Sequence, residues 1–382
     1  MKINICSAVA RLVFLLASVP TASAQTTFSF TNLGTLGGIE SYARAINASG
    51  QIVGISADAS TANHAVIWEW NGSSYNAAVS LSADNSGAQA INASGQITGF
   101  GNLTINTHAT IWANDVGHTA TERPSLTGVK YSAGYGINAS GQVVGQAHNA
   151  SIQFRAVKWN SANPFAITEL TILGSGNESG ASAINTSGQV VGYSRATNNG
   201  PFRAVLWNGV TPTDLGALGL GGNFSGANSI NDSGQIAGWS YIPGDTAPHA
   251  AFWNGVTTAI DLGTLPGGTT SYAMGINTSG LIVGYSDTLA SGGDHAFLYS
   301  NATLYDLNNF VTGASGWTLR QASAINDLGQ IIGYASDVDG NNHAFVLTPV
   351  AIPEPAACAA GLAAVALLAT ARRWRKRAAK FS

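Results

Sequence analysis

Cysteine is almost absent from this chain of 382 residues, which contains two, Cys6 and Cys358. Both lie near the ends, outside the long central body that we place at residues 25–350. The body therefore has no thiol, and this excludes disulfide bonds, cysteine-ligated metals and a cysteine nucleophile within it.

Charged residues are also scarce, at 9% of the chain, and few of those in the body are basic. Without its two ends the chain keeps eight Lys and Arg against 18 Asp and Glu, a net charge of −10. A surface this acidic repels phosphate backbones, so we expect no nucleic acid partner.

Helical periodicity is missing from the body as well. No segment sustains an apolar period of about 3.6 residues, and Gly, Ser, Thr and Asn interrupt the chain at short intervals. These features predict an all-β fold.

Catalytic motifs are absent too: there is no nucleophile elbow, zinc-protease helix or phosphate-binding loop. Four glutamates stand isolated in the sequence: Glu40, Glu122, Glu169 and Glu178. Three aspartates recur in register, as structural residues do: Asp214, Asp261 and Asp306. We therefore expect no enzyme, although sequence leaves open a carboxylate pair assembled in space.

The first 24 residues have the pattern of a secretion signal. Lys2 and Arg11 precede or flank an apolar core, and a small-x-small cleavage pattern ends at Ala24. Cys6 lies inside this leader and not directly after the cleavage site, so the pattern does not indicate a lipoprotein. The leader predicts export.

The tail, residues 351–382, has three parts in a fixed order. Pro353-Glu354-Pro355 comes first, an apolar run of 16 residues follows, and a basic cluster with Arg372, Arg373 and Arg375 ends the chain. A spanning helix needs about 20 apolar residues, so this run forms a short transmembrane helix if its arginines snorkel.

This order resembles the PEP-CTERM sorting signal of Gram-negative bacteria. The resemblance implies processing by an exosortase-type enzyme after transient anchoring in the inner membrane. It also implies delivery to the cell envelope, cell surface or extracellular matrix. A plain C-terminal membrane anchor is the alternative.

Repetition dominates the body. The phrase INASGQIVG at Ile46 returns six more times with small changes, at spacings of 45 to 49 residues. Each unit has three clear short strands and a less regular fourth that carries a DLGTL phrase. Seven such units predict a seven-bladed β-propeller. The N-terminal FSFTN segment is a fourth strand without its first three, so we expect it to complete the seventh blade.

The repeated phrase has the chemistry of a tight hairpin. The side chain of Asn47 can bond the backbone two residues on, and Gly50 can take the left-handed conformation. Asn47 also fits a glycosylation acceptor, but a bacterial-type tail favours the turn.

One position in each unit holds a histidine or an arginine. Its members are His64, His108, Arg155, Arg203, His249, His295 and His343. We expect a structural hydrogen bond between strands; a basic ring that binds a metal or an anion is the alternative. With the HAF-type tripeptides at the histidines and DLGTL at Asp261, the unit resembles the HAF family of bacterial extracellular repeats. This resemblance covers residues 28–348, implies an exported repeat protein and supplies no catalytic residues.

The loop before the HAF-type strand varies most between units and is acidic in units five, six, seven and one. Its acids are Asp58, Asp245, Asp287, Asp294, Asp337 and Asp339. We expect them to form an acidic half of one rim that contacts a ligand. The segment containing Asp337, Asp339 and Asn341 looks like part of a calcium loop without its bidentate Glu. Weak calcium binding is one hypothesis there, an acidic turn the other, and no other cofactor is expected.

These features together predict an exported, non-enzymatic surface or matrix protein. An exposed rim of Asn, Ser, Thr and occasional Trp suits sugar hydroxyls and faces, so we expect envelope components or exopolysaccharide as ligand. A protein-interaction platform is one alternative, and a cryptic polysaccharide lyase or hydrolase is the other.

Overall fold

The computed structural model describes residues 27–82, 85–102, 106–126, 131–161, 166–219, 223–244, 246–255, 258–289 and 293–350. The leader, the sorting motif, the tail arginines and Asp245 lie outside the described residues. Phe28–Pro349 forms one compact unit. Among the described residues there is no helix long and apolar enough to cross a membrane.

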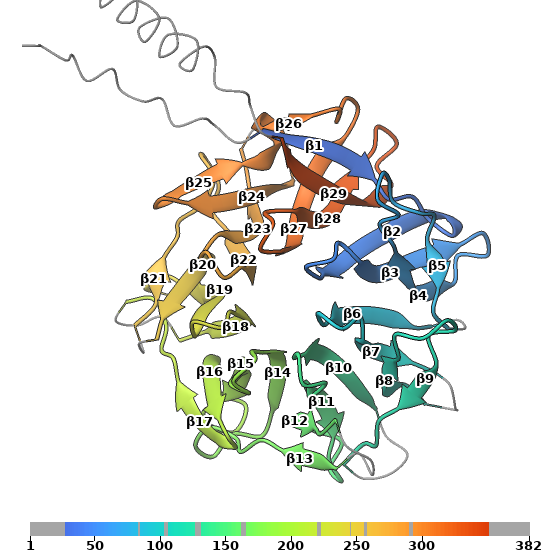
Figure 1. The fold of residues 1–382 in the computed structure, drawn as a ribbon. Helices are drawn as coiled ribbons and strands as arrows, with labels where there is room; N and C mark the ends of the chain where they lie inside the picture. Colours follow the sequence, from blue (N-terminus) through green and yellow to red (C-terminus); the bar gives the residue numbers. More distant parts are fainter. Residues whose placement is uncertain are drawn as a thin grey trace, which may run out of the picture. The chain divides into compact units, whose positions relative to one another are not determined.

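Seven sheets are arranged in a ring (Figure 1), six with four strands and one with five. Residues from all seven sheets line a pocket at its centre, which we call the channel. The predicted seven-bladed β-propeller is therefore confirmed. We number the blades from 1, which starts at β2, to 7, and the strands of each blade from the channel outward.

The first strands are β2 (Gly37–Ile46), β6 (Gly87–Ile91), β10 (Ser132–Ile137), β14 (Ser179–Ile184), β18 (Ser225–Ile230), β22 (Ser271–Ile276) and β27 (Thr318–Ile325). The second strands are β3 (Ile52–Asp58), β7 (Ile97–Gly101), β11 (Val143–His148), β15 (Val190–Arg195), β19 (Gln235–Tyr241), β23 (Ile282–Asp287) and β28 (Ile331–Ser336). The third strands are β4 (Asn63–Trp68), β8 (His108–Trp112), β12 (Phe154–Trp159), β16 (Phe202–Asn208), β20 (Pro248–Asn254), β24 (Asp294–Ser300) and β29 (Asn342–Val350). The fourth strands of blades 1 to 6 are β5 (Val79–Ser80), β9 (Ala120–Glu122), β13 (Ile167–Glu169), β17 (Thr211–Asp214), β21 (Ile260–Asp261) and β25 (Thr303–Asp306).

The N-terminal strand β1 (Thr27–Asn32) closes the ring as predicted. It lies between β29 and a short additional strand, β26 (Val311–Thr312), which pairs with it in parallel. Strand β26 and the 3₁₀ turn η1 (Leu307–Asn309) belong to the connection between blades 6 and 7. This connection departs most from the repeat, and its extra strand is not predicted by the sequence pattern.

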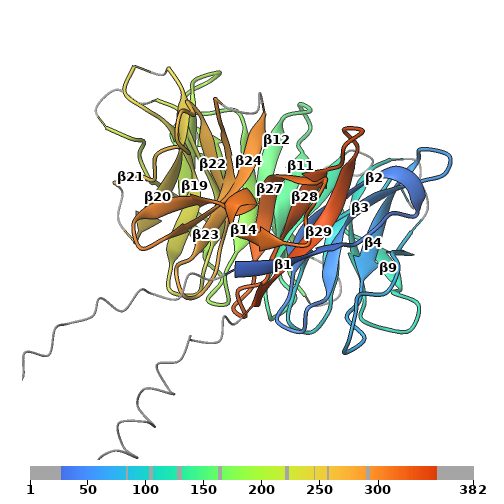
Figure 2. The same cartoon turned by 90° about the horizontal axis from the view of Figure 1, so that it is seen from above.

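Because the strands of a blade are antiparallel, their connections alternate between two faces of the ring (Figure 2). We call the face with the first-to-second and third-to-fourth turns the lower face. The upper face has the second-to-third loops and the connections between blades.

The DLGTL phrase mostly forms a connection and not the fourth strand, which corrects one expectation. In blade 5, β21 ends at Asp261, whose Oδ1 accepts the N–H of Gly263 at 2.7 Å. Gly263 has a φ of 75°, a left-handed value that a side chain would strain. The strand therefore stops at the aspartate, and Leu265 is buried in the cluster between blades 5 and 6.

The asparagine of the repeated phrase does more than shape a hairpin. In blade 4, the Oδ1 of Asn185 accepts from the backbone N–H of Gln189 at 2.9 Å, which holds its own turn. Its Nδ2 donates to the Oε1 of Gln189 at 2.8 Å and to the carbonyl of Asn231 in blade 5 at 3.2 Å. Each of these asparagines reaches the next blade in the same way, and Asn326 returns to the carbonyl of Asn47 at 3.2 Å.

These contacts form a closed ring of seven hydrogen bonds, which we call the asparagine ring. Its members are Asn47, Asn92, Asn138, Asn185, Asn231, Asn277 and Asn326, all of them buried. Asn47 is 5% exposed and both of its amide hydrogens are engaged, so it is no accessible site for glycosylation. The repeated phrase therefore specifies both a turn and the contact between blades.

Apolar clusters also join each pair of neighbouring blades around the ring. The seven buried clusters each contain residues from two neighbouring blades, the seventh and first included. A tryptophan at or next to the end of five of the third strands is fully buried in these clusters: Trp68, Trp112, Trp159, Trp207 and Trp253. These large rings fill the space between sheets, which accounts for their recurrence.

Every first strand contains a β-bulge at one equivalent position. In β2 the pairing skips from Ala43 to Ala45, and the same shift occurs in the other six. A bulge leaves one residue unpaired and redirects its side chain. The bulge residues all line the channel: Arg44, Gln89, Tyr135, Ser182, Asn228, Met274 and Ser323.

Candidate functional site

The recurring basic residue ties the third strand to the fourth in blades 3 to 6. His249 Nδ1 lies 3.0 Å from Asp261, and His295 Nδ1 lies 2.7 Å from Asp306. Arginine makes the equivalent ion pairs in blades 3 and 4, from Arg155 to Glu169 at 3.1 Å and from Arg203 to Asp214 at 3.2 Å. His108 opens β8 in blade 2 and is buried.

Blades 1 and 7 use a different partner because their fourth strands offer no acid. Ser80 in β5 and Asn32 in β1 stand where the other blades have a carboxylate. His64 Nε2 therefore contacts Asp58 Oδ2 at 3.2 Å, and His343 Nε2 lies 3.5 Å from Asp337 Oδ2. Two of the acids expected on the ligand rim are thus occupied by structural histidines.

Asp58 also holds its own loop together. Its Oδ1 accepts from the N–H and hydroxyl of Ser60 at 2.8 and 2.7 Å and from the N–H of Ala62 at 3.0 Å. The hydroxyl of Ser60, helped by Ala62 and His64, lowers the pKa of Asp58 to about 2 against the effect of burial.

We expect Asp58 to make the propeller sensitive to acid. Its pKa is depressed in the folded state, so its contribution is complete above the unfolded value of about 3.9. That contribution is lost as the pH falls from there to about 2. Asp58→Asn keeps an accepting oxygen but cannot titrate, so its melting temperature should fall less between pH 5 and 2.5 than that of the wild type. Asp339→Asn, in the matching loop of blade 7, is the control, because Asp339 is exposed. If the melting temperatures of the wild type and Asp58→Asn fell by the same amount between pH 5 and 2.5, this role of Asp58 would be contradicted.

The hypothetical calcium loop is a self-bonded turn. The Oδ1 of Asp337 accepts from the N–H groups of Asp339 and Asn341, both at 2.9 Å, and its Oδ2 lies 3.3 Å from Asn341 Nδ2. Burial works to raise the pKa of Asp337, but these hydrogen bonds outweigh it and the pKa lies below its ordinary value. Within the described ranges no group of three or more His, Cys, Asp or Glu is placed to hold a metal ion. The alternative of an acidic turn explains these contacts.

Asp287 and Asp294 face each other across β23 and β24 at the upper face but differ in their bonding. Asp287 accepts from Thr270 N at 2.7 Å and from the N–H and hydroxyl of Thr269 at 2.8 and 2.7 Å. Burial works to raise the pKa of Asp287, yet these bonds hold it below its usual range. The carboxylate of Asp294 makes no hydrogen bond or ion pair with the part of the chain that the structure describes.

Asp294 is therefore a half-buried acid of the rim whose carboxylate is open to a ligand. Burial raises its pKa, and the negative charge of Asp287 raises it further. Arg320 and His295 act in the opposite direction.

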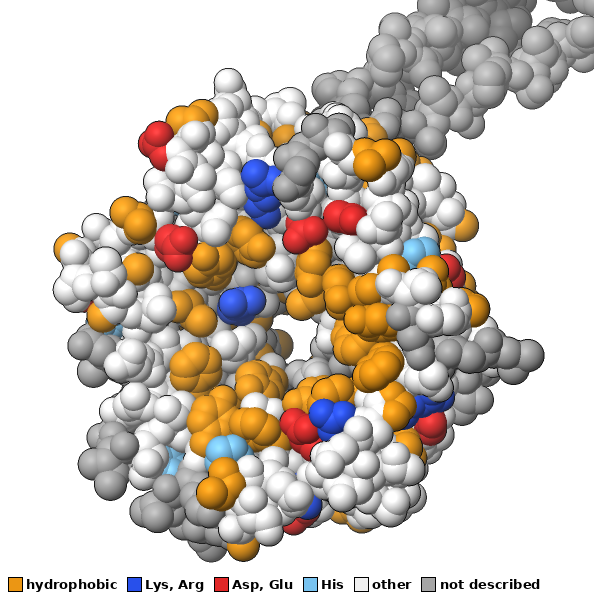
Figure 3. Space-filling model, turned by 180° about the vertical axis from the view of Figure 1, so that it is seen from behind, with side chains coloured by type: hydrophobic (Ala, Val, Ile, Leu, Met, Phe, Trp, Pro, Cys, Tyr) orange, Lys and Arg blue, Asp and Glu red, His pale blue; other side chains and the backbone are white. Residues whose placement is uncertain are grey.

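Half-buried aromatic side chains lie next to Asp294 around the upper end of the channel. We call Trp239, Tyr272, Tyr285, Tyr334 and Tyr42 the aromatic arc; it follows blades 5, 6, 7 and 1. Tyr272 and Tyr285 are stacked at 5.1 Å, Trp239 lies 6.0 Å from Tyr272, and Tyr42 and Tyr334 meet edge to face at 5.1 Å. Figure 3 shows hydrophobic and tyrosine side chains gathered around the central opening.

Burial is the main cause that raises the pKa values of Tyr272, Tyr285 and Tyr334, and the charge of Asp294 adds to it in each case. Asp294 thus acts electrostatically on three members of the aromatic arc. Aromatic faces and an unengaged carboxylate occupy one half of the upper face.

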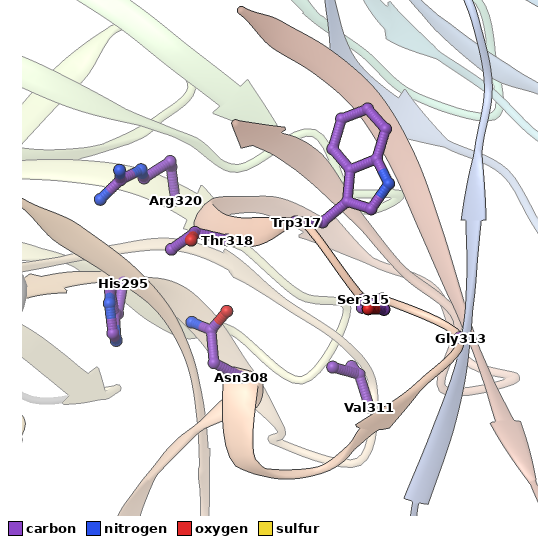
Figure 4. A pocket seen from close by; sticks show the side chains of 9 residues that line it. His295, Asn308, Val311, Gly313, Ser315, Trp317, Thr318 and Arg320 are labelled. Atoms are coloured by element: carbon purple, nitrogen blue, oxygen red, sulfur yellow. The ribbon is translucent and has the colours of Figure 1, made fainter. Parts of the chain in front are cut away.

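A cavity of about 630 Å³ adjoins this half, at the connection that departs from the repeat. Arg320 and Thr318 of β27 lie across from His295 of β24 and Asn308 of η1 (Figure 4), and Trp317 is a further lining residue. Arg320 Nε donates to Ser336 Oγ at 3.1 Å, and the positive charge of Arg320 also acts on Asp294.

Sequence reasoning pointed to the loops and missed both the aromatic arc and the channel. The signal was present within the repeats. The residue three positions before each ring asparagine differs between nearly all units, whereas its neighbours are mostly Ala, Gly or Ile. The residue seven positions after each ring asparagine is glycine in every unit, and an aromatic residue follows it in five of them.

No family model matches the chain, and no curated protein matches it. Among solved structures, it is similar to TolB from Acinetobacter baumannii at 13% identity and a TM-score of 0.44, covering 80% of this chain and 65% of that one. It is similar to an acylaminoacyl peptidase of Pyrococcus horikoshii at 13% identity and a TM-score of 0.46, covering 77% and 50%. The chain thus spans less than two thirds of either protein.

A lectin from Aleuria aurantia, solved in complex with Fucα1-6GlcNAc, has 13% identity and a TM-score of 0.38, over 73% of this chain and 94% of that one. Similarity at these scores does not bear on function, which has to be argued from the site itself.

Proposed function

We propose that this chain is an exported, non-enzymatic propeller that binds polysaccharide of the cell envelope or extracellular matrix through its upper face. The supporting observation is the combination of the aromatic arc with the unengaged carboxylate of Asp294. Half-buried rings offer flat apolar faces to the C–H faces of sugar rings, and a few fixed polar groups orient a ligand on such a surface. The leader and the three-part tail support export through an exosortase-type route.

Binding is a better account of the two rim carboxylates than catalysis. Their pKa values are displaced in opposite directions, which is a feature of acid–base pairs. However, Asp287 accepts three hydrogen bonds from Thr269 and Thr270 in the connection before β22 and is not free to attack or to activate water. A polysaccharide lyase or hydrolase remains the second candidate on the strength of this pair.

We expect Trp239→Ala to weaken retention of the body, residues 25–350, on exopolysaccharide of the source organism by about tenfold, or ~1.4 kcal/mol. The loss follows from removing the ring at one end of the arc. Trp70→Ala is the matched control, because Trp70 is an exposed indole in a third-to-fourth turn of the lower face. Retention would be measured by affinity electrophoresis, with the polymer assayed for reducing ends and unsaturated products.

Equal retention of both variants would remove the aromatic arc from the binding surface. Product release that disappears in Asp294→Asn would establish the enzyme instead. Absence of retention by the wild type would favour a protein partner for the same face.

A further inference from the structure

The channel is a second pocket, of about 380 Å³, whose lining includes no member of the aromatic arc. The seven bulge residues line it, one from each blade, together with Gln146, Tyr193 and Gln321 among others. Its volume is in the range of about 300–1,000 Å³ that is usual for small-molecule sites. A pocket enclosed by all seven blades is suited to a compact molecule.

The wall formed by blades 3 and 4 is internally bonded. Gln146 Nε2 donates to Tyr135 Oη at 2.9 Å, and Tyr193 Oη donates to Gln146 Oε1 at 3.1 Å. Burial raises the pKa of Tyr193 to about 12, so both phenols are neutral at pH 7. This wall has few unused donors.

The wall formed by blades 7 and 1 is different. Arg44 Nε and Ser323 Oγ are both buried and have no hydrogen-bond partner in the described part of the chain. A buried donor without a partner destabilises the folded state, and more so when it is charged. Arg44 and Ser323 belong to the neighbouring blades 1 and 7, and both line the same pocket.

The wall formed by blades 7 and 1 also carries the positive charge of Arg44. Arg44 is the one charged side chain among the described residues that line the pocket, and burial lowers its pKa. No carboxylate pairs with Arg44 among the ion pairs of the described chain, although the body has a net charge of −10. Its guanidinium carbon lies 5.8 Å from the centre of the Tyr42 ring, which positions it without neutralising it. A guanidinium in this state is matched to an incoming anion.

We infer that the channel pocket binds a small hydroxylated carboxylate carrying a single negative charge. Arg44 would hold the carboxylate through two parallel N–H···O bonds, a geometry that guanidinium groups favour. The amides and hydroxyls of Gln89, Gln321, Ser182 and Ser323 would serve the hydroxyl groups. Because the described lining has one cationic side chain and no carboxylate, the pocket favours a ligand with one negative charge.

Isothermal titration of the body, residues 25–350, with D-glucuronate tests this inference. The propeller unit Phe28–Pro349 contains every strand and every cluster between blades, so it can be studied without the leader and tail. We expect glucuronate to bind at least tenfold more tightly than glucose, and Arg44→Met to reduce that binding at least tenfold. Lys158→Met, which also removes one positive charge but lies on a third strand, should bind as the wild type does.

Arg44→Met should also be more stable than the wild type without ligand. Removing an uncompensated buried charge should raise the melting temperature by about 2 °C. This readout shows that a loss of binding is not a loss of fold.

Three results would overturn the inference: wild-type affinity in Arg44→Met, no binding of glucuronate, or binding of inorganic phosphate in preference to glucuronate. The site does not depend on the proposed function of the rim. Polysaccharide retention should be unchanged in Arg44→Met, and its loss would show that the channel and the rim are one site. Failure of the wild type to retain polysaccharide would leave the glucuronate result standing.

Discussion

A body that begins at Gly37, and so lacks β1, will not form a stable monomeric propeller. Strand β1 places Phe28 in the cluster between blades 6 and 7, at 4% exposure. Leu33, directly after the strand, lies in the cluster between blades 7 and 1, at 5% exposure. Losing a buried Phe costs about 3–5 kcal/mol and a buried Leu about 2–5 kcal/mol. Together these losses are comparable with the whole stability of a typical protein, about 5–15 kcal/mol.

The deletion also exposes an edge. Without β1, strand β29 presents its unpaired backbone groups to solvent, and such edges promote pairing between chains. We expect light scattering after size exclusion to show oligomers or aggregates, and circular dichroism to show no cooperative melting near the wild-type temperature.

A circular permutant provides the matched control, with residues 25–36 moved to follow Val350. It has the same composition and restores the strand between β26 and β29 from the other end of the chain. We expect it to be monomeric and to melt close to the wild type. A truncated body that remained monomeric with wild-type stability would show that closure does not depend on β1.

Much of this fold could be predicted because the repeats disclose the architecture. The near-constant spacing of the ring asparagines sets the number of blades, and the incomplete first and last units complement each other. The connection between blades 6 and 7 could be seen only as the longest spacing, 49 residues. Its 3₁₀ turn and β26 follow from contacts with β1, which is some 280 residues away along the chain, so no local pattern announces them.

The candidate site was less predictable, and the acids show why. Asp58, Asp287, Asp294 and Asp337 look alike in sequence, as acids of variable loops. The carboxylates of three of them accept hydrogen bonds from N–H groups or hydroxyls of their own turn or of a connection between blades. The carboxylate of Asp294 accepts none from the described residues. The difference depends on where backbone donors point, which residue type does not reveal. The side chain of Arg44 enters the channel because of a bulge, and simple alternation of residues along a strand does not predict one.

We expect Asn185→Asp to be a strongly destabilising single-atom change in the asparagine ring. The substitution replaces Nδ2 by oxygen, and this atom faces the carbonyl of Asn231 at 3.2 Å and the Oε1 of Gln189 at 2.8 Å. Gln189 can rotate its amide to donate, but the carbonyl cannot. A buried carboxylate would then oppose a carbonyl oxygen, at a cost of about 3 kcal/mol. The melting temperature should fall by about 4–5 °C.

The pH dependence separates this mechanism from a general loss of packing. Opposing acceptors and burial raise the pKa of the introduced carboxyl in the folded state, so its penalty is largest well above that pKa and shrinks as the pH falls through it. Once protonated, the acid can donate to Asn231 and restore the link between blades 4 and 5. The difference from the wild type should therefore be smaller at pH 5 than at pH 8. Asn208→Asp, an exposed change at the end of β16 on the same blade, should show a small difference at both values. A penalty for Asn185→Asp that does not vary with pH would mean that the side chain fills space in the ring without linking the blades.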